Sequence, residues 1–176
     1  MSETLSPIGF TAVEDWTVED FYRFFHQLNI LYNRLYVLEK IKHKGQSRNL
    51  KNAFSGSLSS VSDSHRLTIK SIEIHSPGDF NLLGLDKIIQ QLRDLWKDIS
   101  YQNRLSKQQL AEQNRHDKKM HQLKEVAATQ KLLKNQITLM RELGYTEDEI
   151  AEGMKALSDP IEQLVELANS RKISLK

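Results

Sequence analysis

Residues 17–44 read TVEDFYRFFHQLNILYNRLYVLEKIKHK and carry the strongest secondary-structure signal in the chain. Large apolar side chains recur in it at spacings of 3, 4, 3, 4 and 3 residues, which places them on one continuous face of an α-helix. They are Phe21, Phe24, Leu28, Leu31, Leu35 and Leu38, and the face is widened by Phe25, Tyr32, Tyr36 and Ile41. Thr17 is the expected N-cap, followed by Glu19 and Asp20 in the first turn, where the helix dipole favours negative charge. We therefore predict that 17–44 is the main core helix.

Two segments beside this helix alternate as β-strands do. Apolar residues at every second position predict a short strand at 8–13. In Arg66–His75 the apolar parity switches at Lys70–Ser71, which predicts a bulge or burial on both faces. Strand 8–13 is the expected partner of the second strand, and a third candidate strand is Phe54–Val61, within the polar loop 45–64. These strands predict a small sheet packed on the core helix.

From Leu85 onward the pattern is helical. The spacing of 3 and 4 residues runs to Ile99, fades over 100–119 without any Gly or Pro, and then resumes. We therefore expect one helix, or two collinear ones, over 86–142, spanning about 85 Å at about 1.5 Å per residue. Beyond it, Gly144 is an expected helix C′ residue and Thr146–Glu149 a capping box. Asp159-Pro160 is expected to divide a C-terminal helical hairpin.

The predicted fold is therefore α+β and mostly α, in three regions. A small α+β head occupies 1–84, a long coiled-coil-like helical stalk 85–142, and a C-terminal helical hairpin 143–176. The composition, with 39% hydrophobic and 27% charged residues in 176, is typical of a helix-rich protein with a modest core. No apolar run reaches the roughly 18 residues that a membrane span needs. Residues 1–6 lack the features of a signal peptide, so a cytoplasmic protein is expected.

Few residues in the sequence could carry out chemistry. The absence of cysteine excludes disulfides, thiolate metal sites and a cysteine nucleophile. No phosphate-binding loop, dinucleotide fingerprint or nucleophile elbow is present. His116 and His121 are five residues apart, so on a helix they point in different directions and form a poor metal pair. We expect no catalytic, cofactor-binding or metal-binding residues, and therefore no enzymatic activity.

Charge is distributed in blocks. Residues 101–141 hold nine basic and three acidic residues, net +6, whereas 1–20 hold five acidic residues and no basic one, net −5. Residues 142–176 carry four basic and eight acidic residues, net −4. Such blocks favour pairing between segments or between copies of the chain. Because the polar part of the stalk needs a reason to stay helical, we predict a homo-oligomer. The predicted interface residues are Leu123, Val126, Leu133, Ile137 and Met140.

Two functions fit this pattern. The favoured one is a non-enzymatic, self-associating scaffold or adaptor that assembles through helical seams and positions a protein partner. If exposed, Trp16 or Trp96 is the first candidate for a partner contact, although such residues more often belong to the core. The alternative is a nucleic-acid-binding adaptor that uses the basic face of 104–134. Its possible contacts are Arg104, Lys107, Arg115, Lys118 and Lys119, although acidic residues interrupt this face and no aromatic residue after Tyr101 is available there to stack on bases.

Two short motifs also support a resemblance. Ile72-Glu-Ile-His-Ser-Pro-Gly-Asp-Phe80, with Leu83-Gly-Leu85 after it, resembles uncharacterised bacterial proteins in which a strand, a Ser-Pro-Gly turn and a helix precede a charged coiled coil. A hinge similar to Leu143-Gly-Tyr-Thr-Glu-Asp-Glu149 also recurs in them. The resemblance implies a bacterial origin and brings no established activity or site residues.

Overall fold

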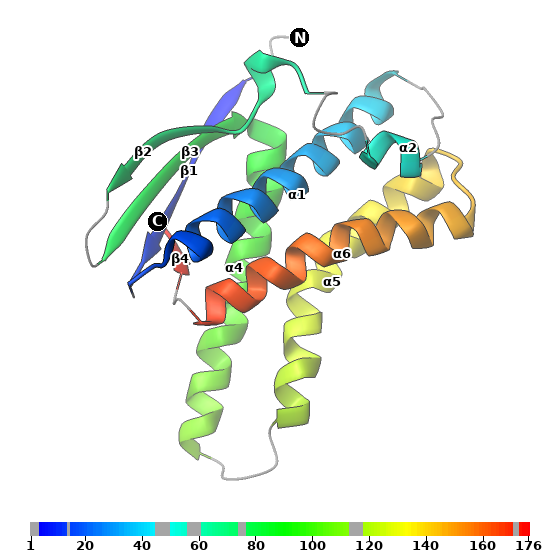
Figure 1. Ribbon diagram of the computed structural model, residues 1–176. Coiled ribbons are helices and arrows are strands. Elements are labelled where there is room, and N and C mark those ends of the chain that lie inside the picture. The colour runs from blue at the N-terminus through cyan, green and yellow to red at the C-terminus, as the bar shows by residue number, and fades with distance from the viewer. Residues whose placement is uncertain are drawn as a thin grey trace.

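The computed structural model describes residues 4–13, 15–44, 50–55, 61–73, 77–112, 118–170 and 173–176, with the side chains of 44, 102–112 and 118–129 left out (Figure 1). In chain order the elements are β1 (Leu5–Ala12), α1 (Val18–Lys44), α2 (Leu50–Ser55), the short 3-10 helix η1 (Asp63–His65), β2 (Thr68–Glu73), β3 (Gly78–Leu85), α4 (Asp86–Glu112), α5 (Lys118–Glu142), α6 (Glu147–Ser170) and β4 (Ile173–Leu175). The predicted α+β, mostly helical class is confirmed.

The four strands form one antiparallel sheet in the order β2-β3-β1-β4. The predicted bulge in β2 is confirmed, because its register against β3 shifts between Ile69 and Ser71. The predicted pairing of this strand with 8–13 was wrong, since β3 lies between β2 and β1. β3 was missed because Asp79, Asn81 and its glycines are poor strand formers, although Phe80 and Leu82 do alternate. Phe54 belongs to α2 instead of the expected loop strand, whose residues 56–60 lie outside the described part of the chain.

Helices α1, α4 and α6 lie on one side of the sheet (Figure 1). The strand residues that face them, such as Ile8, Phe10 and Phe80, are buried. The predicted core helix is confirmed as α1, and its N-terminus is a capping box: the Asp20 N–H donates to Thr17 Oγ1 at 3.2 Å and the Thr17 N–H to Asp20 Oδ2 at 2.9 Å. Burial of the alternating strand face against the helices is the main source of stability in such a layered fold.

Aromatic rings fill the space between α1, the sheet and α4. The ring of Phe24 lies 5.3 Å from that of Phe10 and 5.9 Å from that of Trp96, in edge-on contacts. Trp16 packs 5.1 Å from Phe80. Trp96 is buried and Trp16 is partly buried against the core, so neither is an exposed partner contact. The core interpretation of the tryptophans is confirmed for Trp96.

Gly84 lets α1 approach the sheet closely. A Cβ atom at this position would lie 2.7 Å from Cε2 of Tyr32, a distance that no side chain could adopt without displacing the ring. The Tyr32 hydroxyl accepts a hydrogen bond from the Leu85 N–H at 2.9 Å and donates one to the His65 carbonyl at 2.6 Å. Tyr32 therefore ties α1 to the end of β3 and to η1, and the glycine makes room for it.

The region 86–142 is neither one helix nor two collinear ones. α4 and α5 pack side by side and run in opposite directions (Figure 1). Residues 113–117, between them, lie outside the described residues and contain no Gly or Pro that would signal a reversal. The chain turns back because this buries Leu132, Leu139 and Met140 of α5, which an extended stalk would expose to water.

The expected break at Asp159-Pro160 was also wrong, since α6 runs unbroken through Pro160. A proline in a helix lacks the N–H that would donate to the carbonyl four residues earlier, here that of Ala156. The guanidinium of Arg34 on α1 donates to that carbonyl instead. The predicted helix signals before α6 are confirmed: Gly144 has a φ of 81°, and Thr146 and Glu149 form a capping box with hydrogen bonds of 3.0 and 3.3 Å.

One hydrophobic core takes residues from all three predicted regions. It extends from Ile8 in β1 through the helices to Ile173 in β4. The C-terminal strand β4 pairs with residues 10–12 of β1, which brings the end of the chain back to its beginning.

Candidate functional site: the two-helix arm and its root

The C-terminal part of α4 and the N-terminal part of α5 extend side by side away from the rest of the fold (Figure 1). The last buried residue among the described side chains of α4 is Ile99, and the first of α5 is Leu132. We call the helical residues between them, 100–112 and 118–131, the arm. At about 1.5 Å per residue its 13 residues of α4 span about 20 Å. Tyr101, at the base of the arm, is 57% exposed.

A chain of polar side chains, which we call the root network, joins α5, α4 and α1 between the arm and the start of α4. The amide nitrogen of buried Gln136 on α5 donates to Gln91 Oε1 on α4 at 3.1 Å, and Gln91 Nε2 in turn lies 3.4 Å from Glu39 Oε1 on α1. Glu39 lies 3.7 Å from the ring of His43, which lies 3.1 Å from Lys87 Nζ. Because a buried amide must keep its hydrogen-bond partner, this network fixes how α5 sits on α4.

The predicted interface residues are divided between the arm and the core. Met140 is buried, and Leu133 and Ile137 are partly buried against the chain's own core. The side chains of Leu123 and Val126 lie in the arm, outside the described side chains. An interface between copies through this seam stays a prediction, and three of its five positions already contact the rest of the chain.

The predicted nucleic-acid contacts also belong to the arm or its connection. Arg104, Lys107, Lys118 and Lys119 are on its helices, outside the described side chains, and Arg115 lies outside the described residues. The basic run continues on α5 as Lys131 and Lys134, whose side chains are exposed.

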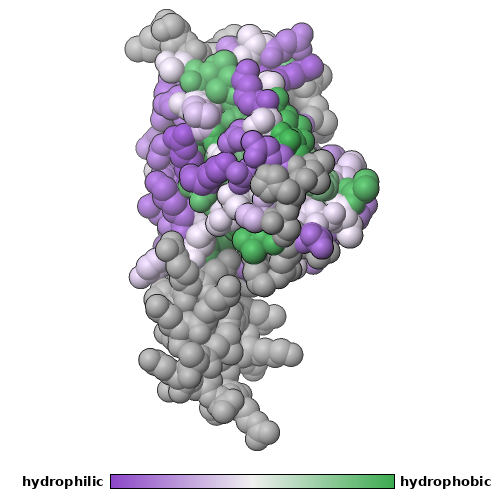
Figure 2. All heavy atoms as spheres, turned by 90° about the vertical axis from the view of Figure 1, so that its left-hand side faces the viewer, coloured by the Kyte–Doolittle hydropathy of each residue, from purple (hydrophilic) through white to green (hydrophobic). Residues whose placement is uncertain are grey.

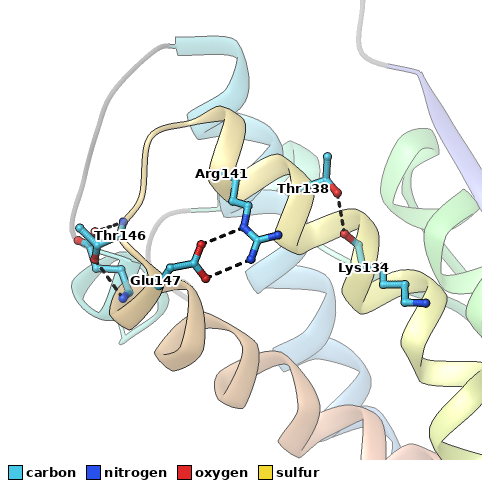
Figure 3. Close-up of polar contacts among 6 residues, drawn as sticks. Lys134, Thr138, Arg141, Thr146 and Glu147 are labelled. Carbon is cyan, nitrogen blue, oxygen red and sulfur yellow. Dashed lines mark hydrogen bonds and ion pairs between the residues drawn. The ribbon is translucent and has the colours of Figure 1, made fainter.

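At the C-terminal end of α5, Arg141 forms a bidentate ion pair with Glu147 (Figure 3). Its Nε donates to Glu147 Oε1 at 3.0 Å, and its Nη2 donates to Glu147 Oε2 at 3.1 Å. Hydrogen bonds and charge attraction between the two raise the pKa of Arg141 and lower the pKa of Glu147. Both groups are exposed, so the pair contributes little stability. This pairing holds Glu147 as a carboxylate at the start of α6, where the helix dipole also favours negative charge.

Arg34 is a polar residue whose role the sequence analysis missed. Burial lowers the pKa of its guanidinium, and the nearby charge of Asp159 opposes that effect. The only signal in the sequence is a proline inside a strongly amphipathic helix, which requires a replacement donor from elsewhere. The donor comes from a residue 122 positions earlier in the chain, so no local pattern could reveal it.

The described residues hold no group of three His, Asp or Glu side chains placed to bind a metal ion. Among the described helices, none combines the length and apolar character that crossing a membrane requires.

Comparison with known proteins adds no relative: no protein-family model, curated protein or solved structure matches the chain.

Proposed function

We propose that this protein is a non-enzymatic, self-associating adaptor of the cytoplasm, whose α+β body presents the α4–α5 arm to a protein partner. The observation that carries the proposal is the projection of two long helices beyond the core to which both are anchored (Figure 1). The root network supports the role, because it holds the arm in one orientation relative to α1.

The composition of the arm explains why it would need a partner. Nine of the 27 residues of the arm are apolar, one third, against 39% in the whole chain. No other described element covers the two helices of the arm (Figure 1). Helices of this polarity draw most of their stability from packing. A third helix supplied by a partner would bury the remaining apolar residues and complete the arm.

The experiment that tests the arm is site-specific photo-crosslinking. A photoreactive phenylalanine derivative replaces Tyr101, 57% exposed at the base of the arm, and in a control replaces Tyr22, 60% exposed on α1. We expect a discrete adduct with another protein from position 101 only. The purified partner should bind the full chain, and its affinity should fall at least about 10-fold when residues 104–127 are replaced by a short Gly-Ser linker. Equal adducts from both positions, or unchanged binding by the shortened chain, would exclude the arm as the partner surface.

Nucleic-acid binding is the second candidate, favoured by exposed Lys131 and Lys134 as a continuation of the basic run. Replacing Lys118 and Lys119 with glutamate should then weaken binding to single-stranded RNA at least about 10-fold. It should also reduce the slope of log affinity against log salt by roughly 0.7 per lost phosphate contact, while self-association is spared. Lys42→Glu with Lys155→Glu is the matched control, because both lysines are exposed outside the arm. Equal weakening by the control pair would argue against this candidate.

A further inference from the structure

The two edges of the sheet differ. One edge strand is β4, which has only three residues and pairs with residues 10–12 of β1. Beyond β4, the Lys176 N–H donates to the Gly9 carbonyl at 2.9 Å, and Arg93 donates to the carbonyl of Pro7, which itself has no N–H. At the other edge β2 is the last strand, and no described element pairs with its outer side. With six residues against the three of β4, β2 is the longer edge strand and therefore the better place to extend the sheet.

Beside this open edge, β2 carries apolar side chains that continue the core face of the sheet. Ile69 pairs with Leu82 and Ile72 with Phe80, and directly opposed residues of antiparallel strands share a face. Leu82 and Phe80 are buried, whereas Ile69 is 48% exposed and Ile72 39% exposed. Figure 2 views the side of the molecule that bears β2 and β3, where hydrophobic groups stand among hydrophilic ones.

We propose that a second copy of this chain pairs with β2, so that two sheets join across a two-fold axis into one eight-stranded sheet. The proposal rests on the self-association proposed above and names its surface. In the register that pairs all six residues of each strand, Ile69 lies opposite Ile72 of the second copy, and Ile72 opposite its Ile69. Thr68 lies opposite Glu73 of the second copy, on the other face. Each exposed isoleucine is thereby covered by another.

Charge also favours a second copy in antiparallel orientation. β2 has Lys70 near its middle and Glu73 at its end. Antiparallel pairing places Lys70 opposite Ser71 of the second copy, two residues from its Glu73, whereas parallel in-register pairing would oppose like charges.

An assembly formed by pairing at β2 is also limited to two copies. A two-fold interface uses β2 of both chains, and the opposite edge of each sheet is the three-residue strand β4. The result is a closed dimer and not a fibre. Six paired residues per chain make an interface smaller than the roughly 800 Å² per partner of stable complexes, so a dissociation constant in the micromolar range is expected.

The first test measures solution mass against concentration by light scattering, at low and high salt. The wild-type mass should rise from 20.4 kDa toward twice that value at both salt concentrations. Ile69→Lys with Ile72→Lys should raise the dissociation constant at least about 10-fold. Leu5→Lys is the control, because Leu5 is an apolar residue of β1 with a similar exposure of 42%, and it should leave the dimer unchanged. A dimer that resists the double substitution would overturn the proposed surface while leaving self-association intact.

The second test reads the register, using the absence of cysteine in the natural chain. Single variants Ile69→Cys and Ile72→Cys are oxidised separately and as a mixture. Because the register opposes these two positions in different copies, the mixture should form far more intermolecular disulfide than either variant alone. Equal yields would overturn the register. A wild-type chain that stays monomeric at all concentrations and forms no disulfide in the mixture would overturn both this surface and the self-association in the proposed function, but not the arm as a partner surface.

Discussion

Replacing Phe24 with alanine is expected to lower the free energy of unfolding by about 4 kcal/mol. Phe24 is fully buried, and its ring contacts Phe10 of β1 at 5.3 Å, Trp96 of α4 at 5.9 Å and Trp16, just before α1, at 5.4 Å. Alanine would leave a cavity between α1 and the sheet that these rigid rings cannot fill by moving. Since a domain of this kind has a total stability of about 5–15 kcal/mol, this single change would remove a large share of it.

Urea unfolding followed by circular dichroism measures this loss. The matched control is Phe25→Ala, the next residue on α1, which is only partly buried and contacts Phe80 at 5.8 Å. Phe25→Ala should lower the free energy of unfolding by less than half as much, because less of the apolar surface of Phe25 is buried in the folded protein. Equal losses for the two variants would mean that Phe24 is not the centre of the aromatic cluster.

The parts of the fold that depend on local signals were predictable from the sequence. The spacing of Phe24, Leu28 and Leu31 identified α1, and the switch of parity at Lys70–Ser71 identified the bulge of β2. Gly144 marked the end of α5 because a left-handed φ of 81° suits glycine. Each of these features is set by residues within one or two turns of each other, so the sequence pattern carries them.

The errors concern contacts between distant parts of the chain. β3 is held by β1 and β2 on its two sides, and this pairing overrides the poor strand propensity of Asp79 and Asn81. The sequence between α4 and α5 contains no Gly or Pro that would indicate a reversal of direction. The reversal is favoured because it buries Leu132 and Met140 against the rest of the fold. In both cases a tertiary contact decided a question that local preference left open.

In the candidate site, too, local features were predictable and contacts between distant residues were not. The polar, basic character of this region was visible in the sequence. It predicted the seam of an oligomer or, as the alternative, a nucleic-acid contact, and both stay predictions. The root network was not visible in the sequence, because it links Gln136 to Gln91 and Glu39 across three helices. Gln136 in isolation reads as an ordinary surface residue of a helix, and only the packing of α5 on α4 buries it.

The contribution of Arg34 to stability is expected to depend on Pro160. Arg34→Met should lower the free energy of unfolding by about 2 kcal/mol, because it leaves the Ala156 carbonyl without the donor that replaces the missing proline N–H. In a Pro160→Ala background, the new backbone N–H at 160 can donate to that carbonyl. The same Arg34→Met substitution should then cost less, giving an interaction energy of about 1 kcal/mol or more in a double-mutant cycle.

A matched pair on the same two helices shows whether this coupling is specific. Arg23 of α1 also reaches α6, with its guanidinium 3.0 Å from Glu166, but both side chains are substantially exposed. Arg23→Met should therefore cost at most about 1 kcal/mol, and the cost should be the same in the natural chain and in the Pro160→Ala background. If Arg23 coupled to position 160 as strongly as Arg34, the effect would reflect general loosening of α6 on α1. If Arg34 showed no coupling, its hydrogen bond would not be what allows a proline inside this helix.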